Sequence, residues 1–162
     1  MATPPPTIAP GDPREPAVAA ALRAYLTEVQ DACGINGAEL DAAVADVQDY
    51  VAPTGAFLVA RDAEGGVVGC AALRALDATT GEVKRMWVAP AARGTGLGAR
   101  LLAAIEEQAA QRGLRTLCLD TNGTLAAAVA LYTSRGYVEI ERYNDHSDAT
   151  HFFQRQLPVA EP

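Results

Sequence analysis

One segment constrains the fold more than any other, because it joins a strand pattern to a long helix pattern through three closely spaced glycines. The loop is Arg93-Gly94-Thr95-Gly96-Leu97-Gly98, and an apolar strand pattern covers residues 82–88 before it. The helix pattern that follows places Leu97, Leu101, Leu102, Ile105 and Ala109 on one face, and Gly113 ends it. The sequence therefore predicts a strand–loop–helix unit with the helix amino terminus at the glycines.

This loop has the features of an anion-binding site. The first backbone N–H groups of a helix have no intrahelical acceptor, and the helix dipole adds a partial positive charge at the same end. Glycines allow the backbone to close around a phosphate without interference from Cβ atoms. Arg93 and Arg100 flank the glycines and could add charge-assisted hydrogen bonds. The segment therefore predicts a site for a phosphorylated ligand.

Other glycine motifs fit the same residues less well. A turn that only caps the helix would need neither three glycines nor two flanking arginines. Residues 94–99 formally satisfy the dinucleotide fingerprint G-x-G-x-x-A, but five residues including Pro90 separate them from the strand, and antiparallel hairpins precede that strand. A P-loop is excluded because no Gly-Lys-Ser/Thr follows.

The remaining apolar patterns predict one mixed α/β domain. Residues 1–16 are rich in proline and predict a flexible leader with one short edge strand around 7–9, and residues 17–162 are expected to form the single domain. Helical spacing covers 17–32, 38–50 and 125–134, and strand patterns cover 56–61, 67–76, 82–88, 114–120, 137–142 and 151–157. Three antiparallel strands therefore precede the glycine loop, and helices and strands alternate after it.

Composition and charge exclude several classes of protein. The net charge of −7 argues against binding to phosphate backbones, and 49% hydrophobic with 20% charged residues excludes a disordered polyelectrolyte. No apolar run approaches the roughly 18 residues of a membrane span, and no secretory signal pattern is present. Cys33, Cys70 and Cys118 match neither a disulfide framework nor a CxxC zinc site. We expect a cytoplasmic protein that binds neither nucleic acid nor membrane.

Several segments together resemble the GNAT superfamily of acyl-CoA-dependent N-acetyltransferases. The loop 93–98 is similar to its Arg/Gln-x-x-Gly-x-Gly/Ala signature, and residues 82–88 and 117–121 look like its fourth and fifth strands. Leu131-Tyr132-Thr133-Ser134-Arg135-Gly136-Tyr137 resembles its Leu-Tyr-x-x-x-Gly-Phe/Tyr element. The resemblance covers nearly the whole chain. It implies an α/β (mixed α+β) GNAT fold: a mixed, mostly antiparallel twisted sheet of six to seven strands, about four flanking helices, and a splay between strands four and five.

The resemblance implies acetyl-CoA as the co-substrate. Its pantetheine arm would lie in the splay and pair with the backbone of Met86, Trp87 and Val88. The backbone amides of Arg93, Gly94, Thr95, Gly96, Leu97, Gly98 and Ala99 would bind the pyrophosphate, with Arg100 beside them. Many family members have an Asn seven residues before the active-site Tyr. This chain has Leu125 there, and Asn122, three residues earlier, is the substitute candidate for that contact.

Tyr132 and Glu82 are the catalytic candidates that the resemblance implies. Tyr132 would protonate the leaving CoA thiolate, whereas outside the family context it would be a core aromatic of an amphipathic helix. Glu82 would be the general base, because the attacking amine must be neutral; the alternative is a solvated carboxylate at a strand end. Lys84 and Arg85 alternate with apolar residues, which favours an exposed strand face for both.

We expect the acceptor to be a primary amine, on either a small molecule or a peptide. His146 and His151 lie in the polar stretch that leads into the last strand and could contact this acceptor. Two histidines without a third ligand do not make a metal site, so no metal is expected. A non-catalytic acyl-CoA-binding module and a transferase for another acyl-CoA are the alternative functions, and the resemblance also allows a homodimer.

Overall fold

The computed structural model describes residues 3–33, 48–53, 55–146 and 149–158. The strands are β1 (Thr7–Pro10), β2 (Gly55–Arg61), β3 (Val67–Ala75), β4 (Thr80–Val88), β5 (Thr116–Thr121), β6 (Val138–Ile140) and β7 (His151–Gln156). The α-helices of the described residues are α1 (Pro16–Cys33), α3 (Leu97–Gln111) and α4 (Ala126–Ser134). Two short 3₁₀ helices, η1 (Gln48–Tyr50) and η2 (Pro90–Ala92), complete the regular structure of these residues.

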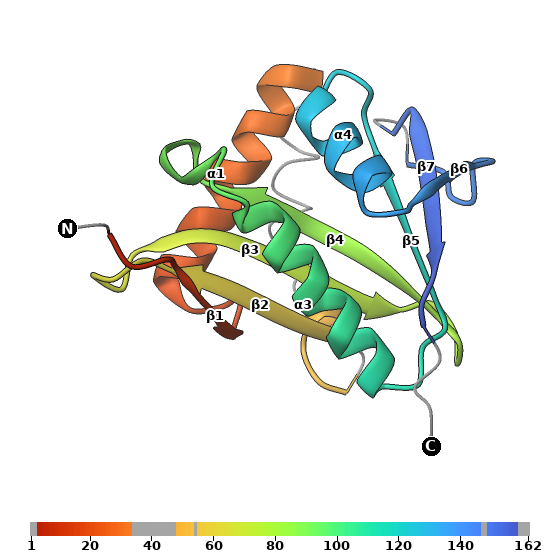
Figure 1. The fold of residues 1–162 in the computed structure, drawn as a ribbon, viewed down its shortest axis with the longest axis horizontal. Helices are drawn as coiled ribbons and strands as arrows, with labels where there is room; N and C mark the ends of the chain where they lie inside the picture. Colours follow the sequence, from red (N-terminus) through yellow and green to blue (C-terminus); the bar gives the residue numbers. More distant parts are fainter. Residues whose placement is uncertain (1–2, 34–47, 54, 147–148, 159–162) are drawn as a thin grey trace.

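The seven strands form one mixed sheet in the order β1-β2-β3-β4-β5-β7-β6. Strands β4 and β5 are parallel, and the other neighbouring pairs are antiparallel. Helix α3 crosses one face over β2, β3 and β4, and α1 packs on the opposite face (Figure 1). This arrangement confirms the mixed α/β fold expected from the sequence, with seven strands.

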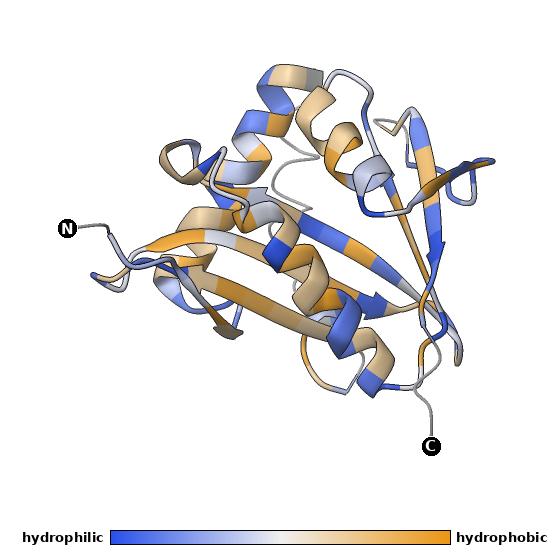
Figure 2. Ribbon diagram, viewed as in Figure 1, coloured by the Kyte–Doolittle hydropathy of each residue, from blue (hydrophilic) through white to orange (hydrophobic). Residues whose placement is uncertain are grey.

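Each face of the sheet has its own apolar core. On the α3 face, Leu101 and Ile105 pack against strand residues such as Leu58, and on the α1 face Leu22 packs with Phe57. Neighbouring residues of a strand point to opposite faces, so Phe57 and Leu58 serve the two cores. Figure 2 shows β2 and β3 hydrophobic along most of their length, whereas hydrophilic residues interrupt β4. The hydrophilic residues of β4 mark the part of the sheet where charged side chains stand among the apolar core residues.

The structure shifts some boundaries expected from the sequence. Strand β5 begins at Thr116 rather than 114, because the amide of Leu114 bonds to Ala109 at the end of α3. Strand β6 covers three residues rather than 137–142, because only Val138–Ile140 pairs with β7 and the Tyr137 amide bonds to Tyr132 at the end of α4. The helix expected over 38–50 lies outside the described residues, except for η1 at its end. The edge strand expected near residues 7–9 is β1, paired with β2.

Strands β4 and β5 share only a short ladder and then separate. Thr80–Glu82 pairs with Thr116–Cys118, and the last pair is Glu82 with Cys118. Beyond it, β4 continues to Val88 beside β3, while β5 continues to Thr121 beside β7. We call the facing, unpaired segments 83–88 and 119–121 the splay. The divergence of the two strands is visible in Figure 1.

A β-bulge in β4 lies at the edge of the splay. Cys70 pairs with Trp87 and Ala72 pairs with Lys84, so two β4 residues stand opposite one β3 residue. Arg85 takes up the extra length with a positive φ of 56°, and its carbonyl accepts a hydrogen bond from the Cys70 thiol at 3.2 Å. A bulge bends its strand and increases the local twist. The bulge therefore gives a local cause for the departure of β4 from β5.

Candidate active site

The glycine loop joins the end of β4 to the start of α3 and leaves its amides unpaired. Gly94 and Gly96 have φ of 78° and 84°, a backbone conformation that favours glycine. The first backbone bond of the helix runs from the Arg100 amide to the Gly96 carbonyl at 3.1 Å. Within the described part of the chain, none of the backbone N–H groups of residues 94–99 donates to a protein acceptor. The loop therefore presents a row of free donors at a positive helix end.

The two arginines of the motif are both bound to protein groups in this structure. Arg93 donates from Nε to the Val88 carbonyl at 2.9 Å and from Nη2 to the Glu28 carboxylate on α1 at 2.6 Å. Arg100 donates from Nη2 to the Pro6 carbonyl at 3.0 Å. Arg93 thus fixes the loop against both β4 and α1. Its side chain stays 49% exposed, so the guanidinium remains accessible from solvent.

The end of β4 divides its side chains between the two cores. The Trp87 side chain is buried in the α1 core and donates from Nε1 to Glu28 at 3.2 Å, while Met86 and Val88 pack toward the α3 core. The Ala89 amide bonds to Val68 of β3, so the backbone groups of Val88 point to the other edge of the strand. That edge faces the splay. Of the three residues predicted to pair with a ligand, the backbone of Val88 is therefore directed toward the splay, and its carbonyl accepts the bond from Arg93 Nε.

A close approach of α3 and α4 brings Tyr132 toward the loop. A Cβ atom on Gly98 would lie 3.3 Å from Leu131 Cδ2 of α4, so the small residue permits this packing. Tyr132 follows Leu131 and is buried, with its ring 5.9 Å from Tyr137 and 6.4 Å from Phe153. Its hydroxyl makes no hydrogen bond to any described residue.

The environment of Tyr132 keeps its phenol protonated. Burial raises the pKa of Tyr132 above its ordinary value, and the nearby Tyr25 and Asp120 side chains raise it further. Burial likewise raises the pKa of Tyr25 to about 12. The Tyr132 ring packs against Phe153, which pairs with Leu119 in the splay segment of β5. Tyr25, on α1, was not among the candidates from the sequence.

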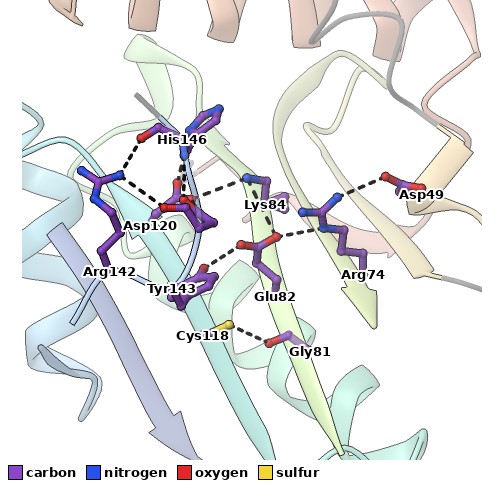
Figure 3. Close-up of polar contacts among 11 residues, drawn as sticks. Asp49, Arg74, Gly81, Glu82, Lys84, Cys118, Asp120, Arg142, Tyr143 and His146 are labelled. Atoms are coloured by element: carbon purple, nitrogen blue, oxygen red, sulfur yellow. Dashed lines mark hydrogen bonds and ion pairs between the residues drawn. The ribbon is translucent and has the colours of Figure 1, made fainter. Parts of the chain in front are cut away.

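A cluster of charged and polar side chains spans the point where β4 and β5 separate (Figure 3). Glu82 is fully buried, and its carboxylate accepts bonds from Arg74 Nε at 2.9 Å and the Tyr143 hydroxyl at 2.6 Å. Arg74 in turn reaches Asp49 at 3.2 Å. Burial raises the pKa of Tyr143, and its bond to the Glu82 carboxylate raises it further. Glu82, the predicted general base, is thus a buried carboxylate that accepts two hydrogen bonds. It is not the solvated carboxylate that was the alternative expectation for a strand end.

The second carboxylate of this cluster is Asp120, near the end of β5. Its Oδ2 accepts a bond from Asn144 Nδ2 at 2.7 Å, and its Oδ1 lies 3.8 Å from His146 Nδ1. Lys84, the one lysine of the sequence, places Nζ 4.0 Å from Glu82 and 3.9 Å from Asp120. The Lys84 side chain is only 11% exposed. The exposed face expected for Lys84 is therefore wrong, because Arg74 of β3 and the loop after β6 cover that face.

The structure separates the two candidate histidines. His146 lies at Asp120 within the cluster, whereas His151 pairs with Thr121 and stacks on Phe153, which belongs to the α3-side core. His151 Nδ1 lies 2.7 Å from Thr150 Oγ1.

The Asn122 candidate for the cofactor contact lies in the turn before α4. Its Oδ1 accepts bonds from the amide and the hydroxyl of Thr124, at 2.9 and 2.8 Å. Asn122 thus shapes the entry to α4, and its role toward a cofactor stays a prediction.

Most residues of the charged cluster were not predicted as site residues from the sequence. Its unassigned members are Arg74, Lys84, Asp120, Tyr143 and Asn144. The available signal was the placement of charged residues inside apolar strands, as Glu82 and Lys84 are in β4. Charges two residues apart on a strand share a face and need partners there when that face is covered. The partners come from distant segments, so the pattern alone did not name them.

No group of three or more His, Cys, Asp or Glu side chains in the described residues could hold a metal ion. Among those same residues, no helix has the length and apolar character needed to cross a membrane.

Comparison with known proteins places this arrangement in one class. A family model described as "Acetyltransferase (GNAT) domain" matches residues 53–139, more than half of the chain. A solved protein from Klebsiella pneumoniae, assigned as an acyl-CoA N-acyltransferase, is 32% identical, with a TM-score of 0.76 over 94% of this chain and 97% of that one. The chain therefore shares its overall fold with that Klebsiella protein. The chain belongs to the GNAT acetyltransferase family, as the sequence resemblance indicated.

Two other relatives extend the comparison. An IAA acetyltransferase of Azospirillum brasilense is 46% identical over 96 residues, which are 58% of this chain and 61% of that protein. The match therefore spans about three fifths of the length of the curated relatives. A GNAT family acetyltransferase of Elizabethkingia anophelis, solved with acetyl-CoA bound, has the same fold, with 18% identity and a TM-score of 0.66 over 94% of this chain and 98% of that one.

Proposed function

We propose that this protein is an N-acetyltransferase that transfers the acetyl group of acetyl-CoA to a primary amine while both substrates are bound. One observation carries the proposal: the free amides of residues 94–99 open directly beside the splay of β4 and β5. Free amides at a helix end suit a pyrophosphate, and an unpaired strand edge suits the amide groups of pantetheine.

The residues present fit acetyl-CoA. The amides of residues 94–99 would bind the pyrophosphate, with Gly94 and Gly96 supplying a backbone that no Cβ atom obstructs. The Arg93 amide, also expected there from the sequence, donates instead to the Pro90 carbonyl at 3.3 Å. The backbone of Met86–Val88 would hold the pantetheine arm in the splay. Acetyl-CoA supplies an activated acetyl thioester, and the protein supplies the position of the amine relative to it. The acetyl-CoA of the Elizabethkingia relative supports this assignment.

Tyr132 is the residue that we assign as the general acid of the reaction. It lies on α4 next to Leu131, which contacts Gly98 of the glycine loop, and its hydroxyl has no partner among the described residues. Its raised pKa keeps the phenol protonated, so it can donate a hydrogen bond to the sulfur at neutral pH. Full proton transfer to a thiolate, whose conjugate acid has a pKa near 8.5, is uphill from this phenol, so the position of Tyr132 matters more than its acidity.

The acceptor would approach from the α1 face of the sheet. The charged cluster lies on that face, since Lys84 pairs with Ala72 of the α1 core. The sequence-based candidate for the base, Glu82, belongs to this cluster, and so does the candidate acceptor contact His146. The proposal thus assigns the two substrates to two sides of the splay: acetyl-CoA toward α3 and α4, the amine toward α1.

A panel of amines tests the proposal. Purified protein with acetyl-CoA is mixed with amino acids, polyamines, aminoglycosides and short peptides, and release of the CoA thiol is followed. We expect thiol release that depends on one class of amine, with the acetylated amine found by mass spectrometry. A protein that binds acetyl-CoA by calorimetry but acetylates none of them would favour the acyl-CoA-sensing alternative. Repeating the assay with propionyl-CoA and succinyl-CoA tests the choice of donor.

A further inference from the structure

The cluster at the base of the splay contains two carboxylates in different states. They project from neighbouring strands, Glu82 at the last β4–β5 pair and Asp120 two residues beyond Cys118 (Figure 3). Residues two apart on a strand share a face, so Asp120 follows Cys118 on the same side. Cys118 itself lies at the Gly81 carbonyl, 3.5 Å away, and burial raises the pKa of its thiol to about 11.

Glu82 is shielded from a substrate by burial and by a bonded partner on each carboxylate oxygen. Its side chain is 1% exposed, Arg74 binds Oε1 and the Tyr143 hydroxyl binds Oε2. The guanidinium neutralises the charge, and a bond of 2.6 Å from a phenol is short even for a charged acceptor. To reach Glu82, an amine would have to displace one of these two groups.

Asp120 has the opposite character. Its side chain is 9% exposed, and only Oδ2 accepts a hydrogen bond from a described residue, Asn144. Oδ1 faces His146 at 3.8 Å, and Lys84 stands 3.9 Å from Oδ2, both longer than hydrogen bonds. A carboxylate that is already nine tenths buried, with one oxygen that accepts no bond from the described residues, has little further desolvation to undergo when an ammonium binds it.

The position of Asp120 also matches the reaction. It lies in the splay, past the end of the β4–β5 ladder. The Tyr132 ring lies 6.4 Å from that of Phe153, and Phe153 pairs with Leu119, the residue before Asp120. An amine at Oδ1 of Asp120 would therefore be bound on the same part of the splay that Tyr132 borders.

We propose that Asp120 is the catalytic carboxylate that binds the acceptor's ammonium group and removes its proton, and that Glu82 is a positioning residue. The inference rests on the proposed acetyltransferase function. Glu82 anchors Tyr143, and the same loop then delivers Asn144 and His146 to Asp120. Arg142 holds this loop through the carbonyls of Asn144, His146 and Ala149. The acceptor class is a primary amine that arrives as a cation.

The proton and bond changes balance as follows. The ammonium group gives one proton to Asp120, and the resulting neutral amine attacks the thioester carbonyl. A C–N bond forms, the C–S bond breaks, and the CoA thiolate takes a proton from Tyr132. The amide nitrogen loses its second proton, which restores Tyr132 through solvent, and Asp120 returns its proton to water. The sum is ammonium plus acetyl-CoA giving N-acetylamine, CoA thiol and one proton.

A matched pair of acceptors tests this role. The first probe is the alkylamine with the highest rate in the amine panel; the second is its aminooxy analogue, in which oxygen replaces the CH₂ next to the NH₂ group. The alkylamine has a pKa near that of lysine, about 10, and is a cation at pH 7. The aminooxy analogue has nearly the same shape but is neutral, so it needs neither an ammonium partner nor a base.

Asp120→Asn should lower kcat/KM for the alkylamine about 100-fold, the lower range for loss of a general base. For the aminooxy analogue, kcat/KM should fall by less than about tenfold, a tenth of the factor expected for the alkylamine. The Kd for acetyl-CoA should stay unchanged. Glu82→Gln should lower kcat/KM for both acceptors by the same factor. The substitution weakens the anchor of the loop that carries Tyr143 and does not change the proton transfer itself. A readout without turnover is calorimetry on the complex with CoA, where Asp120→Asn should abolish binding of the alkylamine but not of the aminooxy analogue.

Equal losses for both probes in Asp120→Asn, or no loss, would overturn the assignment. A selective loss in Glu82→Gln would transfer the role to Glu82. Asp120→Ser replaces the amide variant where the latter does not fold, since the smaller side chain removes the carboxylate and leaves Asn144 and Lys84 in place. A wild-type protein that acetylates no amine in the panel contradicts the proposed function instead, so the two failures are distinguishable.

Discussion

Glu82 of β4 and Cys118 of β5 form the last pair of the parallel ladder, and every chemical feature of the site is arranged around their separation. The glycine loop lies at the far end of β4, and Tyr132 lies on the helix that follows β5. The charged cluster lies at the point of separation itself. The splayed sheet thus leaves an unpaired strand edge beside a largely buried charged cluster.

The first prediction concerns the left-handed backbone of the glycine loop. Gly96→Ala should lower stability by about 1 kcal/mol, because φ of 84° is unfavourable for any residue with a Cβ atom. It should also raise the Kd for acetyl-CoA about tenfold, equivalent to ~1.4 kcal/mol, because the free amides are redirected. Gly65→Ala is the control: Gly65 has φ of 86° at a hairpin tip with nothing near it. Equal Kd values for acetyl-CoA in the two variants would show that the glycine loop does not bind the cofactor.

The second prediction concerns two tyrosines that touch each other but have different partners. Tyr132→Phe should lower kcat about 100-fold with little change in stability, because the lost hydroxyl has no bond to a described residue. Tyr137→Phe should leave kcat unchanged and lower stability by about 1–2 kcal/mol, because its hydroxyl donates to the buried Glu106 at 3.1 Å. Steady-state kinetics and urea unfolding measure both. The reverse pattern would mean that Tyr132 serves the core only.

The third prediction concerns alkaline pH. Burial raises the pKa of Tyr132 in the folded chain, while the unfolded value is about 10. A raised folded pKa contributes stability that is complete below pH 10 and is lost as pH rises toward the folded value. The free energy of unfolding should therefore fall between pH 10 and 12, and kcat should show no descending limb below pH 10. A tyrosinate absorbance signal that titrates fully by pH 10 in folded protein would contradict this.

The fourth prediction separates two roles of Arg93. Arg93→Gln removes the charge beside the loop and the tether to Val88, so the Kd for acetyl-CoA should rise about tenfold at low salt. Glu28→Gln breaks the same ion pair but keeps the guanidinium, which is then free to turn toward a phosphate. Its Kd should stay the same or fall. If Glu28→Gln weakens binding as much as Arg93→Gln, the arginine acts only as a tether.

Local patterns were enough to predict the elements that carry the cofactor. Loop 93–98 and the helix after it were read from glycine spacing and apolar periodicity, and α3 begins at Leu97 as expected. Those signals are local because backbone conformation and helix amphipathicity depend on neighbours a few residues apart. The same holds for α4, where Tyr132 and Gly136 lie in one short motif.

The acceptor side depends on contacts that no local pattern encodes. Tyr143 reaches Glu82 across 61 residues of sequence, and Arg93 reaches Glu28 across 65. Lys84 seemed exposed because it alternates with apolar residues, yet its face of β4 is covered by side chains from β3 and from the loop after β6. The sequence could indicate that these residues are charged, and the fold decided which of them meet.

Hydrogen–deuterium exchange with and without acetyl-CoA tests the central claim most directly. If the splay and the glycine loop bind acetyl-CoA, the amides of residues 94–99 and of the end of β4 should exchange more slowly with the ligand bound. Protection should spread to the start of α4, and the β2–β3 hairpin tip at Gly65 should not change. Saturation with acetyl-CoA that leaves residues 86–99 unprotected would contradict the account.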